Sequence, residues 1–205
     1  SFIHVAFGTV NGKDGKPFKT RDGGVAKLTD LLETTVEQAN QRVSDRDDAI
    51  AEMIAVGALK FADLSTDRLS GYVFDPERMT APEGKTGPYL QYACVRIESI
   101  VAKAGRLSVD KGEPEIVVSH ECERQLLLAC LNYPVAVQAA AERYQPKEIA
   151  EFAFSLAQAF SRFYAECQVV EQGRVNESRL AICRLVGAIL NQCLYLLGID
   201  VPKRM

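Results

Sequence analysis

The sequence predicts a mainly α-helical protein with a short mixed α/β segment at its N-terminus. Apolar residues recur at three- and four-residue steps over most of the chain beyond residue 25, which is the period of amphipathic helices. Strand-like stretches are confined to residues 2–10 and 72–75. With 205 residues and 47% hydrophobic content, the chain can bury roughly 70% of its unfolded surface, which is enough for a real core.

The N-terminal segment is predicted to be a strand over residues 2–10 followed by a turn cluster over 11–16. A glycine-flanked stretch follows, and it carries Lys16, Lys19, Thr20 and Arg21. Cations, a hydroxyl and a pliable backbone are the groups that grip a polyphosphate. A basic turn of this kind is more often simply solvated, so composition alone favours that interpretation.

Two amphipathic helices are predicted next, over residues 25–43 and 49–61. A short strand is expected at 72–75. Residues 76–87 contain two prolines and two glycines and are expected to form a linker.

The helix predicted at residues 86–104 has the clearest pattern in the chain. Thr86 can cap it, Pro88 suits its first turn, and Gly105 can end it. Its apolar stripe consists of Leu90, Cys94, Ile97, Val101 and Ala104. A second stripe consists of Tyr89, Tyr92, Arg96, Ser99 and Lys103.

A stripe of tyrosines that continues into cations can hold single-stranded nucleic acid, because the rings stack on bases while the charges meet phosphates. If the apolar stripe faces the core, Tyr89, Tyr92 and Arg96 face away from it. Tyrosines at helical spacing more often pack in a core or at its rim, and spacing alone favours that alternative.

The remainder of the chain is predicted to be helical after a polar, variable stretch over 106–118. Helices are expected from Ser119 to the Tyr133–Pro134 step, from there to 144, and over 149–167. Residues 170–176 are predicted to form a loop. Asn176 is expected to cap the last helix, which Gly198 ends.

Charge and cysteine content restrict the class of protein. The formal net charge of −3 argues against indiscriminate binding to nucleic acid, so a nucleic-acid partner would meet local basic spots. Six cysteines without C-x-x-C spacing and only two histidines make a zinc site unexpected, and the thiols are predicted to be reduced core residues of a cytosolic protein. The most apolar window, residues 185–199, is expected to be too short to cross a membrane.

Several motifs resemble those of bacterial-type arginyl-tRNA synthetases. The segment G-x-T-G-P-Y-L-Q-Y-A-x-x-R-I over residues 84–97 is similar to the start of their helical anticodon-binding domain. The segment F-x-x-F-Y-x-x-C-x-V over 160–169 and the end of the chain, 197–205, are also similar. Near the N-terminus, Phe18-Lys19-Thr20-Arg21 occupies the place of the degenerate KMSKS-type loop.

The resemblance implies a division into the end of a class I catalytic domain, residues 1–85, and an all-helical DALR-type anticodon-binding domain, residues 86–205. It implies that Lys16, Lys19, Thr20 and Arg21 contact ATP phosphates, with Lys19 and Arg21 catalytic. The residues implied to bind tRNA are Tyr89, Tyr92, Arg96, Tyr164, Arg204 and Met205. No metal ligand is implied.

The implied activity is ATP-dependent activation of arginine, with Mg²⁺, and its transfer to tRNA in the cytoplasm by a monomeric enzyme. The chain opens within a strand-like pattern without Met, and it contains no H-x-G-H motif. We therefore expect a C-terminal piece of a longer enzyme that is inactive alone. A free-standing tRNA-binding helical module and a structural bundle that binds protein are the alternatives.

Overall fold

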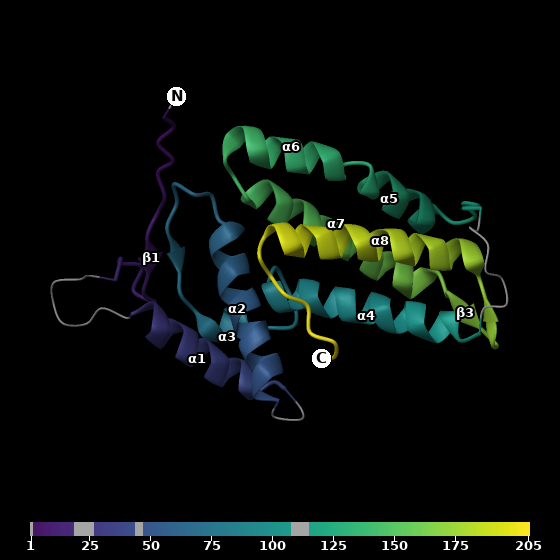
Figure 1. Cartoon of the computed structure of the whole chain (residues 1–205), viewed down its shortest axis with the longest axis horizontal. Helices are drawn as coiled ribbons and strands as arrows, with labels where there is room; N and C mark the ends of the chain where they lie inside the picture. Colours follow the sequence, from purple (N-terminus) through teal and green to yellow (C-terminus); the bar gives the residue numbers. More distant parts are fainter. Residues whose placement is uncertain (1, 19–26, 44–46, 108–114) are drawn as a thin grey trace.

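The computed structural model describes residues 2–18, 27–43, 47–107 and 115–205, and its fold is mainly helical, as predicted. Helices α4 to α8 form a bundle, and α1 to α3 lie at one end of it together with β1 (Figure 1). The helices of the described residues are α1 Leu28–Asn40, α2 Asp48–Leu64, α3 Pro76–Met79, α4 Gly87–Gly105, α5 Glu121–Cys130, α6 Tyr133–Arg143, α7 Lys147–Glu166 and α8 Glu177–Leu196.

The strand predicted at residues 2–10 is almost entirely wrong. Only β1, Val10–Asn11, is a strand, and it pairs in parallel with β2, Tyr72–Val73. A strand needs a neighbour that takes up its backbone hydrogen bonds, and β2 offers only two residues. Phe2 and Phe7, which a sheet would partly cover, are instead exposed.

Two segments predicted to be irregular contain short elements. The expected linker at 76–87 begins with α3, where the Asp75 carboxylate accepts from the Arg78 N–H at 3.4 Å. The expected loop at 170–176 contains a hairpin of β3, Val170–Glu171, and β4, Arg174–Val175. Gln172 and Gly173 have positive φ angles of 49° and 80°, as a tight two-residue hairpin turn requires.

Helix α4 is organised as its sequence predicts. Thr86 caps it by accepting from the Tyr89 N–H at 3.2 Å, and its apolar stripe faces the bundle, with Leu90 and Cys94 fully buried. Its first turn lies against α2 so closely that a Cβ on Gly87 would be 2.3 Å from the Gly57 carbonyl oxygen. Glycine at both positions therefore sets the approach of α2 and α4.

The bundle core lies between α4, α7 and α8, with α5 and α6 packed against α7. By length and composition alone, α8 could cross a membrane, whereas residues 185–199 were expected to be too short for that. In the structure, 44% of its most apolar window is buried inside the bundle. Asn176 caps it through the Arg179 N–H at 3.0 Å, as predicted.

The six cysteines are all unpaired, and five of them are buried, in agreement with the sequence analysis. Burial raises the pKa of Cys94, Cys183 and Cys193 to about 12. These thiols therefore stay protonated at neutral pH and act as small apolar side chains.

One buried ion pair joins α5 to α8 at the far end of the bundle. Glu123 is 1% exposed, and its carboxylate accepts from Arg179 Nε at 2.6 Å and from the backbone N–H groups of Ser119 and His120. Burial alone would raise the pKa of Glu123, but these donors together lower it. Helix α5 begins one residue later than predicted, because its N-cap residue is His120 and not Ser119.

Candidate nucleic-acid interface

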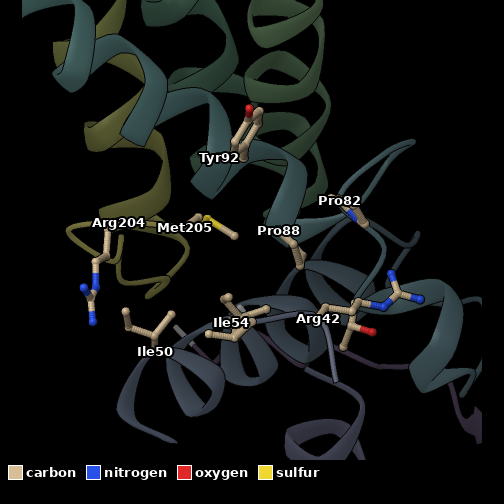
Figure 2. Close-up of a pocket in the computed structure, with 10 residues that line it drawn as sticks. Arg42, Ile50, Ile54, Pro82, Pro88, Tyr92, Arg204 and Met205 are labelled. Atoms are coloured by element: carbon tan, nitrogen blue, oxygen red, sulfur yellow. The ribbon is translucent and has the colours of Figure 1, made fainter. Parts of the chain in front are cut away.

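A cavity of about 250 Å³ lies between α2, the start of α4 and the C-terminal residues. Figure 2 shows its walls converging from these elements, with Met205 between Tyr92 on one side and Ile54 on the other. Its lining residues are Arg42, Val43, Ile50, Ile54, Thr80, Pro82, Pro88, Tyr92, Arg204 and Met205. Two of the residues that the resemblance singled out at the C-terminus, Arg204 and Met205, thus meet Tyr92.

The cavity walls are mainly apolar, and its two arginines lie at opposite ends (Figure 2). Arg42, just beyond α1, donates from Nη2 to the Glu77 carbonyl at 2.9 Å. Arg204 donates from Nη2 to the Asp47 carboxylate at 3.3 Å, and Asp47 also caps α2. Each guanidinium is therefore held by a contact with the protein while it lies at the rim of an apolar hollow.

Arg96 connects the cavity to α7. Its guanidinium carbon lies 4.6 Å from the ring centroid of Tyr92 and 5.2 Å from that of Tyr164. Both tyrosines are substantially exposed, at 38% and 44%. A cation between two aromatic faces is attracted to both, so it orders the two rings on one surface.

Tyr164 does not line the cavity itself. Its ring stacks on Phe160 with centroids 6.2 Å apart, and Phe160 is 1% exposed. The surface that results runs from Tyr164 over Arg96 and Tyr92 to Met205 and Arg204, and we call it the aromatic surface.

Tyr89 is not part of this surface, which corrects the expectation that it faces away from the core. Its ring lies 5.5 Å from that of Phe154, and its hydroxyl is 3.2 Å from Ser161 Oγ, both on α7. Positions 89 and 92 differ by about 60° around a helix. Helix α7 covers the first position and leaves the second open, a distinction that spacing within α4 alone does not contain.

The predicted phosphate-gripping loop is described only in part. Lys16 is exposed, and its backbone N–H donates to the Asp14 carboxylate at 3.1 Å. Lys19, Thr20 and Arg21 lie outside the described residues.

Six of the ten residues that line the cavity come from outside α4 and the C-terminus, and the sequence did not predict them. Ile50 and Ile54 are one helical turn apart on α2, and Pro82 comes from the segment expected to be a linker. The i, i+4 spacing of the two isoleucines marked a shared face, but it gave no sign that this face would be left partly uncovered.

Comparison with known proteins identifies the larger part of the chain. Residues 90–205 match the family model described as DALR anticodon binding domain. The chain belongs to this family. Residues 1–76 match a second model, described as tRNA synthetases class I (R), catalytic domain. The aromatic surface lies within the DALR match, whereas Arg42, Ile50 and Ile54 lie within the catalytic-domain match.

This chain is similar to several arginine–tRNA ligases. It is 43% identical to the enzyme of Maricaulis maris, 44% to that of Hyphomonas neptunium and 42% to that of Francisella tularensis subsp. novicida. In each comparison 98% of this chain is covered but only 36% of the relative, so the chain spans about a third of the length of these relatives.

Two solved structures have the same fold. Thermus thermophilus arginyl-tRNA synthetase matches with a TM-score of 0.86 and 29% identity, over 98% of this chain and 35% of that one. The arginyl-tRNA synthetase of Plasmodium falciparum matches with a TM-score of 0.78 and 26% identity over the same shares.

Proposed function

We propose that this chain is the C-terminal, tRNA-binding part of an arginine–tRNA ligase and that its aromatic surface and cavity receive the anticodon loop. The observation that carries the proposal is the meeting of Tyr92, Arg204 and Met205 at one cavity within a DALR domain. Their partners Arg96 and Tyr164 extend the same surface.

The chemistry of the cavity suits an unstacked base. A base that leaves the loop needs a flat or soft apolar partner, which a tyrosine ring or a methionine thioether supplies. The apolar walls from Ile50, Ile54 and Pro88 exclude water from the faces of the base. Arg42 and Arg204, at the two ends, can meet the phosphates on either side of the flipped nucleotide.

Catalysis is assigned to the longer protein. Its activity would be ATP-dependent activation of arginine and transfer of arginine to tRNA, in the cytoplasm. Residues 1–85 would contribute the end of the catalytic domain, with Lys16, Lys19, Thr20 and Arg21 at the ATP phosphates, and residues 86–205 the tRNA-binding domain. Among the described residues no group of His, Cys, Asp or Glu is placed to hold a metal, so the Mg²⁺ that accompanies ATP is assigned no ligand there. The chain is proposed to be a monomer. It is also proposed to be catalytically inactive alone, because it contains no H-x-G-H motif.

Removing one stacking partner should weaken RNA binding without unfolding the bundle. Deletion of Met205, and Tyr164→Ala separately, should each cost about 1–3 kcal/mol of binding free energy, the usual value for one lost stacking contact. The measurement is the Kd for arginine tRNA, set beside the melting temperature of each variant. In the longer enzyme, ATP and arginine binding should be almost unaffected.

Tyr195→Ala is the matched control, because Tyr195 is 75% exposed and does not line the cavity. It should change neither tRNA affinity nor melting temperature. A large fall in the melting temperature of Tyr164→Ala, together with normal affinity after deletion of Met205, would refute the assignment.

A further inference from the structure

Gln91 on α4 is a fully buried polar residue that contacts two other segments. Its Nε2 donates to the Met53 carbonyl of α2 at 3.2 Å and to the Asp200 carbonyl at 2.7 Å. Asp200 belongs to the C-terminal segment, residues 199–205, which we call the tail. One side-chain amide therefore joins α4, α2 and the tail.

The backbone around Gln91 has the space that this arrangement needs. A Cβ on Gly57 of α2 would lie 2.7 Å from Gln91 Nε2. A side chain at 57 would therefore force the amide to shift, and Gly87 allows the two helices to lie close together one turn away. Both N–H bonds of the amide are used on carbonyl acceptors, which fixes its orientation.

The Ile199 N–H at the start of the tail donates to the Leu194 carbonyl of α8, and two side-chain contacts near the tail lead to α2 or its cap. The Lys60 ammonium on α2 donates to the carbonyl of Gly198, the residue immediately before the tail. Arg204 donates to Asp47, the N-cap residue of α2. Between the Lys60 and Arg204 contacts, the buried amide of Gln91 holds the Asp200 carbonyl. Asp200 lies five residues before Met205, whose side chain lines the cavity.

We propose that Gln91 is a positioning residue for anticodon-loop binding: it holds the tail so that Arg204 and Met205 line the cavity. The inference rests on the proposed function of that cavity. The Asp200 carbonyl accepts a hydrogen bond from a side chain that has no contact with solvent, so loss of the amide would remove a buried bond between the tail and α4. Without the amide, the tail would lose this hydrogen bond to α4, and Met205 would leave the cavity with it.

The test compares Gln91→Met, which keeps the length but removes both donors, with Gln91→Asn, which keeps the donors but is too short to reach both carbonyls. Gln138→Met is the control, since Gln138 is exposed on α6 and its amide donates to Glu142 of the same helix. Hydrogen exchange of residues 199–205 and of α7 is followed in each variant of this chain. Binding is measured with a synthetic RNA hairpin that carries the anticodon loop of an arginine tRNA.

Both Gln91 variants should speed exchange in the tail by about tenfold and leave α7 unchanged, because one buried hydrogen bond is worth about that factor. The Kd for the hairpin should rise by roughly tenfold, as after loss of one stacking partner. Deleting Met205 from either variant should add little further loss, since Met205 has already left the cavity. A residue that only stabilised the fold would give additive losses.

Unchanged tail exchange in both variants would overturn the inference, and so would exchange that rises equally in the tail and in α7. Additive losses with the Met205 deletion would also overturn it. If the unsubstituted chain does not bind the hairpin, the proposed function fails, and tail exchange still decides whether Gln91 holds the tail.

Discussion

Phe160→Ala should lower the free energy of unfolding by about 3–5 kcal/mol, the cost of truncating a fully buried aromatic residue. Phe160 is 1% exposed and lies in the longest apolar stripe, with the ring of Phe163 6.0 Å away. The alanine would leave a cavity at the centre of the α4–α7–α8 core, and close-packed neighbours fill such a space only in part. The measurement is a denaturant titration followed by circular dichroism.

Phe7→Ala is the matched control for this prediction. Phe7 is 87% exposed, so truncating its side chain changes the buried apolar area very little. The denaturation midpoint should therefore be unchanged. A Phe160→Ala variant as stable as Phe7→Ala would mean that the core described for α7 is wrong.

Neutralising Lys19 or Arg21 in the longer enzyme should slow formation of arginyl-adenylate by about 10²–10³-fold. Charge builds on the departing pyrophosphate in the transition state, and a cation placed there stabilises that state more than the ground state. The effect should therefore fall on kcat. ATP–pyrophosphate exchange in the presence of arginine measures it.

Lys13→Ala provides the comparison for the loop. Lys13 belongs to the same basic segment, but its side chain is 71% exposed and pairs with Asp75 at 3.8 Å. Such a surface pair contributes little, so this variant should exchange at the normal rate. If the Lys19 and Arg21 variants also show normal ATP–pyrophosphate exchange, the loop is an ordinary solvated turn.

The helices were predictable because the residues that mark each one lie within or next to that helix in the sequence. Thr86 and Asn176 mark helix starts by capping, and Leu90, Cys94 and Phe160 fall on buried faces at helical spacing. The strand at 2–10 failed for the opposite reason. Its existence depends on a partner elsewhere in the chain, and only Val10 and Asn11 find one among the described residues.

The candidate site was predictable only where motifs marked it. Tyr92 and Met205 were identified by resemblance, but Ile50 and Pro82, which line the same cavity, belong to segments with no such signal. Tyr89 shows the same limit within one helix, since the choice between core and surface was made by α7. Packing between elements distant in sequence decided all three cases.

The most direct test of the account is whether this chain distinguishes anticodon loops. Two RNA hairpins with the same stem are compared by Kd, one with the anticodon loop of an arginine tRNA and one with an unrelated loop. We expect the arginine loop to bind at least about tenfold more tightly, because each base held in the cavity and on the aromatic surface contributes about 1–3 kcal/mol. Deletion of Met205 should reduce that ratio. Equal affinity for the two hairpins, unchanged when Met205 is deleted, would contradict the assignment of this surface to the anticodon.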